Sequence, residues 1–312
     1  MKPFIITIDT EGDNQWDISQ SSTTKNSRFV PRFQEKCEQY NLKPVYLVDY
    51  SMSHDPFLVE FLNDCLRRGT CEVGMHLHAW DTPPNIKIDT INDRPYLVEY
   101  SNEIIHEKLS ILHNTLVSAF NGSITSHRAG RWIINNYYLQ ELEKLGYSVD
   151  CSITHGIGWN GDVKKYAGNV DYSARKKIVP YHINNLSILE VPPSIHRMRT
   201  NGIETTKGLK NCLRSMKASV FGKNSWIRPS LCTTAEVIKM IDYSAKNDDY
   251  LEFMMHSSEF MPGGSPYYRT EKDIDELYVE LDKIFSHAID QQCCGFTLKE
   301  YCNFLRTGVR DD

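Results

Sequence analysis

The feature that most constrains the fold is a regular alternation of short apolar runs with amphipathic segments. The amphipathic segments carry apolar residues at i, i+3, i+4 and i+7, which is the helical period. We expect strands at 3–9, 43–49, 71–77, 123–128, 147–153, 186–192, 250–256 and 294–297, and helices at 28–40, 56–68, 102–120, 134–145, 234–247, 270–290 and shortly after 297. A strand followed by a helix, repeated about seven times, is typical of a parallel sheet with crossover helices. The sequence therefore predicts an α/β fold.

Several of these strands end in ionisable residues. They are Asp9 and Glu11, His76 and His78, His127 and Arg128, and His256. A closed α/β barrel gathers the carboxyl ends of its strands around one mouth, whereas an open doubly wound sheet gathers fewer of them at a switch point. The wide spread of polar strand ends favours a barrel. No repeat, low-complexity tract or linker divides the chain, so residues 1–312 are predicted to form one domain.

The composition excludes several classes of protein. The 312 residues are 40% hydrophobic and 24% charged, as in ordinary soluble proteins, and the net charge of -5 argues against a nucleic-acid partner. No apolar stretch approaches the ~20 residues of a transmembrane helix. The first residues lack the apolar region of a secretion signal. We therefore expect a cytoplasmic protein, with peripheral membrane attachment as an alternative. The nine cysteines include no C-x-x-C pair and are expected to be reduced.

Two pairs of potential metal ligands are spaced two residues apart. His76 and His78 lie in "EVGMHLHAWDTPP", and Asp9 and Glu11 lie in "TIDTEGD". Residues i and i+2 of a strand point to the same face, so each pair can aim at one point. Two histidines and one carboxylate suit zinc or another divalent first-row metal, and the remaining carboxylate suits a general base. The alternatives are an exposed strand end with two unrelated histidines and an acidic turn.

Five motifs together give the chain a family resemblance. They read "TIDTEGD", "EVGMHLHAW", "SHRAGRW", "VDCSITHGIGW" and "MMHSSEF". In this order, over roughly residues 4–300, they resemble the polysaccharide deacetylases of carbohydrate esterase family four, the NodB-homology group. The "HLHAWDTPP" run is similar to a branch associated with surface-polysaccharide gene clusters. The resemblance implies a distorted (β/α)7–8 barrel.

The first two motifs imply the base and the metal site. By the resemblance Asp9 is the base and Glu11 a metal ligand, with Asp13 as a competitor for Glu11. His76 is a ligand, but the residue four positions later, normally the second histidine, is Trp80. His78 is then the second ligand, with altered geometry. The expected cofactor is a divalent metal, zinc first, with cobalt, nickel, manganese or iron as alternatives.

The third motif implies an arginine that supports the base. Arg128 holds the base ionised through a charge-assisted pair. The turn after it supplies a backbone N–H for the oxyanion. Gly130 replaces the usual proline, which leaves open whether Arg131 or Trp132 gives that donor. Trp132 could also be only a rim aromatic.

The last two motifs imply the acid and its support. Asp150 supports either Arg128 or the catalytic histidine. His256 protonates the leaving amine, and Glu259 orients it or binds substrate. Because base and acid need opposite protonation states, a bell-shaped pH–rate profile is predicted.

Further substrate contacts are expected around the barrel mouth. Trp80, Arg131 and Trp132 are candidates, and Arg197 and Arg199 could hold a charged substrate. The basic run over 207–228 is expected to be a solvated face, with an anionic group or a membrane surface as alternatives. The G-x-G-x-x-G pattern at 156–161 opens no helix, so we interpret it as a sugar-contacting loop rather than a dinucleotide site.

The predicted function is metal-dependent N-deacetylation of an amino sugar in surface-glycan biosynthesis. The expected partner is an amino-sugar saccharide, either nucleotide-linked or lipid-linked. One alternative keeps the scaffold and changes the amide, as in a deformylase or a ureide or imide amidohydrolase. Another is a catalytically silent carbohydrate-binding relative, which the departure at the second histidine suggests. The oligomeric state is left open.

Overall fold

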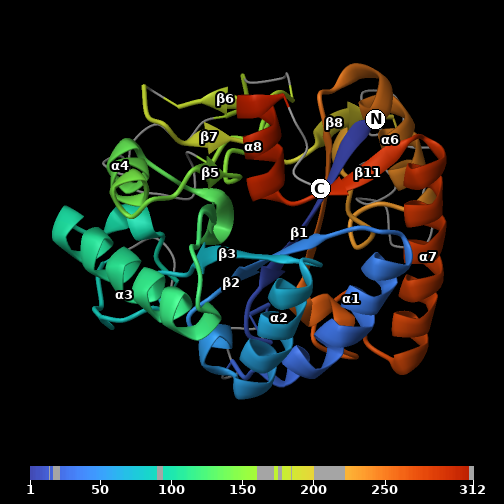
Figure 1. Ribbon diagram of the computed structural model, residues 1–312. Coiled ribbons are helices and arrows are strands. Elements are labelled where there is room, and N and C mark those ends of the chain that lie inside the picture. Colours follow the sequence, from blue (N-terminus) through green and yellow to red (C-terminus); the bar gives the residue numbers. More distant parts are fainter. Residues whose placement is uncertain are drawn as a thin grey trace, which may run out of the picture.

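Strands from nearly the whole length of the sequence form one curled sheet (Figure 1). The computed structural model describes residues 1–13, 15–16, 22–89, 94–159, 172–174, 178–183, 185–199 and 222–308. In these residues the sheet has nine strands in the order β10-β1-β2-β3-β4-β5-β7-β6, and β11 also pairs with β1. All pairs are parallel except β6 with β7. Strands β10 and β6 stand at the two ends of this order and do not pair with each other in the described residues, so the sheet is a half-barrel.

Except for β6, which no expected strand covers, the strands of this sheet agree in position with the apolar runs and are mostly shorter. They are β1 (Lys2–Thr10), β2 (Pro44–Val48), β3 (Glu72–Leu77), β4 (Ser126–Ala129), β5 (Val149–Asp150), β6 (Tyr181–His182), β7 (Leu189–Glu190), β10 (Leu251–His256) and β11 (Cys293–Phe296). A separate antiparallel pair joins β8 (Ile195–Met198) to β9 (Lys223–Trp226). The predicted α/β fold is confirmed.

The helices follow the strands as predicted. They are α1 (Val30–Gln39), α2 (Pro56–Arg68), α3 (Asn102–Phe120), α4 (Asn136–Lys144), α6 (Thr234–Asn247), α7 (Glu271–Asp290) and α8 (Leu298–Thr307). Helix α2 begins after Asp55, whose side chain accepts from the Leu58 N–H, and ends at Gly69, with a left-handed φ of 66°. These are a standard N-cap and a standard C-terminal glycine. None of the described helices is long and apolar enough to cross a membrane.

The two faces of the sheet have different surroundings. Phe4, Ile6 and Ile8 point outward into the main core, which also contains buried side chains of the surrounding helices α1, α2, α3 and α7 (Figure 1). The alternating residues of β1 point inward. Ile5 lies in a second apolar cluster together with Leu298 and Tyr301 of α8. The interior is therefore apolar where the strands begin, and polar side chains are left for the ends of β1, β3, β4 and β10.

Candidate active site

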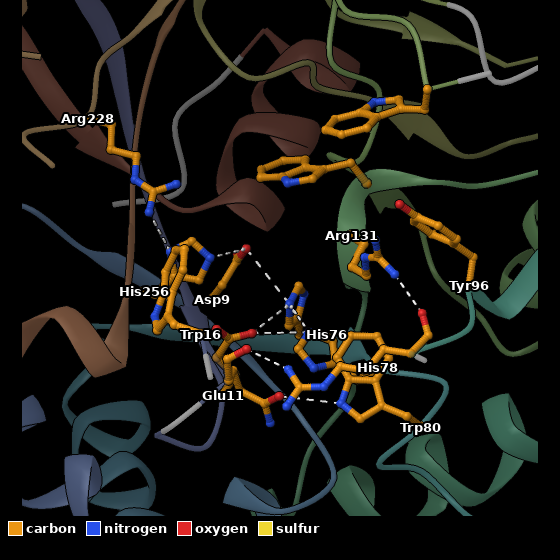
Figure 2. A pocket seen from close by; sticks show the side chains of 14 residues that line it. Asp9, Glu11, Trp16, His76, His78, Trp80, Tyr96, Arg131, Arg228 and His256 are labelled. Atoms are coloured by element: carbon orange, nitrogen blue, oxygen red, sulfur yellow. Dashed lines mark hydrogen bonds and ion pairs between the residues drawn. The ribbon is translucent and has the colours of Figure 1, made fainter. Parts of the chain in front are cut away.

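A cavity of about 560 Å³ lies where β1, β3 and β10 end. Its lining combines acids, histidines, arginines and aromatic rings (Figure 2). The lining residues are Asp9, Glu11, Gln15, Trp16, His76, His78, Trp80, Arg94, Tyr96, Arg131, Trp132, Trp159, Arg228 and His256. The structure therefore brings together residues from all five motifs, with Trp159 representing the fourth.

Three side chains in this cavity could hold a metal ion. Glu11, His76 and His78 are buried, and each offers one ligand atom within 4.8 Å of the others. Nε2 of His76 lies 2.9 Å from Nε2 of His78, and Oε2 of Glu11 lies 3.1 Å from His78 Nε2 and 3.7 Å from His76 Nε2. Tetrahedral zinc with bonds of about 2.0–2.1 Å needs ligand atoms about 3.3 Å apart. These separations bracket that value, so the residues fit a divalent metal.

The protonation of Glu11 and His78 also suits a cation, whereas Asp9 and Glu11 outweigh burial and raise the pKa of His76. Nδ1 of His76 lies 3.1 Å from the Arg128 carbonyl oxygen and donates to it, which leaves Nε2 as the free ring nitrogen. Burial and the neighbouring His76 lower the pKa of His78, which favours its neutral form. Burial opposes ionisation of Glu11, but His256, His76 and His78 outweigh it and hold its pKa well below the usual range. An anionic carboxylate thus faces two imidazoles.

Asp13, the competitor for Glu11, has other partners. Its Oδ1 accepts from the backbone N–H and the hydroxyl of Thr23, at 2.8 and 2.7 Å. Among the described residues the potential metal cluster contains Glu11 and omits Asp13. The Glu11 backbone is fixed by its carbonyl oxygen, which accepts from Asn26 Nδ2 at 2.7 Å. The placement favours Glu11.

Gly130 is explained by the unusual position of the second histidine. A Cβ at residue 130 would lie 2.3 Å from Cδ2 of His78 and 2.4 Å from the Leu77 carbonyl oxygen. The His78 ring and the end of β3 therefore occupy the space that any side chain here would need. The sequence differs from the motifs that it resembles at His78 and at Gly130, and the structure places these two residues next to each other.

Gly130→Ala is expected to weaken zinc binding by roughly 10- to 100-fold, because the methyl group displaces His78. The measurement is competition with a chelating dye, with unfolding of the metal-free protein followed in parallel. Gly122→Ala is the matched control, since a Cβ there meets nothing closer than the Phe120 carbonyl oxygen at 3.5 Å. Unchanged zinc affinity in a folded Gly130→Ala protein would contradict this account.

Asp9 is held by a buried arginine. Nη1 of Arg128 donates to Oδ1 of Asp9 at 2.7 Å, and Nη2 donates to Oε1 of Glu252 at 2.7 Å. Burial by itself would raise the pKa of Asp9, but Arg128, His76 and His256 outweigh it and lower that pKa. Oδ2 lies 3.8 Å from Nε2 of His76 and 3.8 Å from Nε2 of His256. Asp9 is therefore an ionised carboxylate with Oδ2 among the site histidines.

His256 is oriented by a residue of its own motif. Its Nδ1 lies 2.9 Å from Oε1 of Glu259, which also accepts from Nη2 of Arg228 at 2.6 Å. Nε2 of His256 then faces Asp9 Oδ2. The Trp16 ring meets the His256 ring edge to face, with centroids 5.0 Å apart. Glu259 is fully buried behind His256 and does not line the cavity.

The turn after β4 has an uncommon backbone. Arg131 and Trp132 have φ values of 62° and 69°. Left-handed conformations in non-glycine residues cost on the order of 1–2 kcal/mol each and gather at functional sites. The Trp132 ring is held between the Arg128 guanidinium, 4.7 Å from its centre, and the Trp226 ring. The turn thus directs two cavity-lining side chains from consecutive positions.

Asp150 lies away from the cavity. Its Oδ1 is 2.6 Å from Nδ1 of His127 and accepts from Ser152 Oγ at 2.7 Å. The Ser152 hydroxyl oxygen in turn accepts from the Ala129 N–H. Asp150 therefore supports the end of β4 through Ser152, and contacts neither the Arg128 side chain nor His256 in the described structure.

Arg197 and Arg199 are exposed and do not line this cavity. Arg197 lines a second hollow of about 370 Å³ with His155 and Tyr243. In the basic run, residues 207–221 lie outside the described residues. Arg228 is only 6% exposed, so the expectation of a solvated face is wrong for it.

Sequence reasoning did not select Gln15, Trp16, Arg94, Tyr96, Trp159 or Arg228 as site residues. Trp159 lies within the G-x-G-x-x-G pattern that was interpreted as a sugar-contacting loop, so a signal for it was present in the sequence. Asn160 and Gly161 of the same pattern lie outside the described residues. Arg94 and Tyr96 stand in an irregular segment without periodicity, and nothing in their spacing points to the site.

Comparison with known proteins finds similar structures but no similar sequences. No protein-family model and no curated protein matches the sequence. A Mycobacterium smegmatis protein assigned to the polysaccharide deacetylases has a TM-score of 0.54 at 12% identity, covering 100% of this chain and 94% of that one. The fold is the NodB-type distorted barrel. The predicted barrel class is therefore confirmed.

Two further solved structures are similar to this chain. A 4-alpha-glucanotransferase from Thermococcus litoralis has a TM-score of 0.56 at 12% identity, with 97% of this chain and 40% of that chain covered. A family 4 acetyl xylan esterase from Clostridium thermocellum, in complex with cobalt, has a TM-score of 0.49 at 11% identity, covering 99% and 93%. At 12% identity the likeness to the M. smegmatis and T. litoralis proteins concerns the fold alone.

Proposed function

We propose that this chain is a metal-dependent hydrolase that removes the acyl group, an acetyl in the first instance, from the nitrogen of an amino sugar. The observation that carries the proposal is the convergence of three units in one cavity: a Glu-His-His ligand set, the Asp9–Arg128 pair and His256 held by Glu259. A carboxylate base, an acid and a metal position are together what metal-assisted amide hydrolysis uses.

The metal would be held by Glu11, His76 and His78. A divalent ion bound there supplies Lewis acidity toward the amide carbonyl and makes water a better nucleophile. Zinc suits the nitrogen and oxygen donors, and cobalt, nickel, manganese and iron share this preference. Three protein ligands would leave positions open for water and substrate, as in catalytic metal sites.

Asp9 would act as the general base. Its lowered pKa keeps it ionised at neutral pH, and Arg128 occupies Oδ1 while Oδ2 faces the ligand set. Oδ2 can therefore accept the proton of the attacking water. A second carboxylate, Glu11, belongs to the ligand set, so the two acids have separate roles.

His256 would give its proton to the departing amine. Nδ1 is directed at Glu259, so Nε2 is the atom that exchanges a proton with substrate. In the turn after β4, a backbone N–H of Arg131 or Trp132 would stabilise the negative oxygen that develops on the carbonyl. The support for this last role is the strained backbone at these two positions.

The aromatic lining supports a saccharide as substrate. Four of the five tryptophans of the chain line the cavity, namely Trp16, Trp80, Trp132 and Trp159. Aromatic rings with a polar edge offer flat apolar surfaces together with a donor, and the C–H faces of sugar rings pack on such surfaces. The assignment of the M. smegmatis neighbour to the polysaccharide deacetylases supports the same substrate class. We place the reaction in surface-glycan biosynthesis on the resemblance of the "HLHAWDTPP" run.

The test measures metal content and acyl release together. The zinc-loaded protein should hold one ion per chain, and His76→Ala should lose both the ion and hydrolysis. A panel of N-acetylated and N-formylated amino sugars is then assayed for free amine, acetate and formate. Formate release alone would indicate a deformylase, and sugar binding without release of either acid would indicate a silent relative. A protein that holds no divalent ion would overturn the proposal.

A further inference from the structure

Two arginines form one wall of the cavity together with two aromatic rings. The Arg131 guanidinium lies 3.9 Å from the centre of the Tyr96 ring, and its Nη1 donates to the Arg94 carbonyl oxygen at 2.6 Å (Figure 2). The Arg94 guanidinium lies 5.3 Å from the centre of the Trp80 ring and donates to the Gln15 carbonyl oxygen. These contacts fix both guanidinium groups in place while both still line the cavity.

The charges elsewhere in the site are matched by neighbours. Asp9 pairs with Arg128, which also pairs with Glu252. Arg228 pairs with Glu259 at 2.6 Å. Glu11 faces the two histidines of the ligand set.

Arg131 differs from these residues. Within the described parts of the chain it forms no ion pair, and its only hydrogen bond donates to a backbone carbonyl. A guanidinium carries five N–H donors in a fixed fork that matches carboxylate or phosphate oxygens. Its backbone is also held in the costly left-handed region, with φ 62° and ψ 25°, in a turn that directs its side chain to the cavity. A cation that is fixed, half-buried and uncompensated fits an anionic ligand.

We propose that Arg131, together with Arg94, binds an oxyanion carried by the saccharide, so that the substrate is an acidic N-acylamino sugar. This inference rests on the proposed deacylation and names its substrate class. The oxyanion is either a sugar carboxylate, as in a hexosaminuronic acid, or a phosphate on the anomeric oxygen. Both chemistries match the guanidinium fork, and the experiment separates them.

The test compares three ligands on the zinc-loaded full-length protein: N-acetylglucosamine, its 6-carboxylate and its 1-phosphate. Binding constants are measured by calorimetry and kcat/KM by amine release. At least one acidic ligand should bind roughly 10- to 100-fold more tightly than the neutral sugar, the range for hydrogen bonds to charged groups. The acid with the larger ratio identifies the anion. Equal binding of all three ligands would overturn the inference.

Arg131→Asn is the informative variant, because asparagine tolerates the left-handed conformation and keeps the turn. This variant should remove the preference for the acidic ligand. If the anion instead bound zinc directly, the variant would keep the preference, and that result would overturn the proposal. Arg197→Asn, at an exposed arginine of the other hollow, is the matched control and should keep the preference. Loss of the preference in Arg197→Asn but not in Arg131→Asn would also overturn it. Because binding is measured apart from turnover, a preference without hydrolysis would contradict only the proposed function.

Discussion

Asp9→Asn is expected to lower kcat for acyl release by roughly 10²- to 10⁴-fold, which is the contribution of a positioned general base. Asparagine keeps the shape of the side chain and can still accept from Arg128 Nη1, but it cannot take up the proton of water. The ligand set does not include Asp9, so one zinc per chain should remain bound. Single-turnover amine release and metal analysis on the same preparation check both statements.

The control for this variant is Asp13→Asn, the other aspartate of the motif. Its carboxylate accepts from Thr23, so the change should affect the loop that follows β1 and leave zinc binding in place. If Asp9→Asn retained more than about a tenth of the wild-type kcat, the base would have to be a different group. If Asp13→Asn lost zinc, Asp13 rather than Glu11 would be the ligand.

The fold was accessible from the sequence because its signals are local. The periodicity of α2 gives the helix, and its ends are marked by Asp55 and Gly69, so the expected and observed bounds coincide at Pro56 and Arg68. Strands are less well delimited. The run over 147–153 pairs only at Val149 and Asp150, because the ladder ends where the partner strand ends. Pairing depends on a neighbour that is distant in the sequence.

The same distinction applies within the site. The pairs spaced two residues apart, Asp9 with Glu11 and His76 with His78, are local and were found, although Glu11 and His78 lie just beyond the ends of β1 and β3. The partner of Asp150 depends on register, since β4 and β5 place it opposite His127. Local patterns in a single sequence do not reveal that register.

The contact of Arg228 with Glu259 is equally inaccessible, because it joins residues 31 positions apart across the end of the sheet. Composition around Arg228 indicated a solvated face, whereas tertiary packing buries it. Gly130 shows the reverse case. The glycine was visible in the sequence, but the reason that no side chain fits there became clear only from the position of the His78 ring.

Arg128→Met is expected to reduce the free energy of unfolding by about 3–5 kcal/mol at neutral pH, because it leaves two buried carboxylates without their cation. Arg128 is fully buried between Asp9 and Glu252, each at 2.7 Å. The folded-state pKa of Asp9 is lowered, so its pairing contributes stability above the unfolded value of about 3.9, and this stability is lost as the pH falls through the folded value. The difference between variant and wild type should therefore shrink in acid. Urea unfolding at neutral and acidic pH measures it.

Two comparisons separate the buried charge from the loss of side-chain volume. Arg68→Met removes an arginine that pairs with Asp64 and Glu38 at the surface, and it should cost about 1 kcal/mol or less. The double variant Arg128→Met/Glu252→Gln removes one of the stranded charges and should be more stable than Arg128→Met alone. In Arg128→Met the pKa of Asp9 loses its strongest lowering influence, so the acidic limb of kcat/KM should move to higher pH. An unfolding free energy within 1 kcal/mol of wild type, or an acidic limb that does not move, would mean that Arg128 does not hold the base in its ionised form.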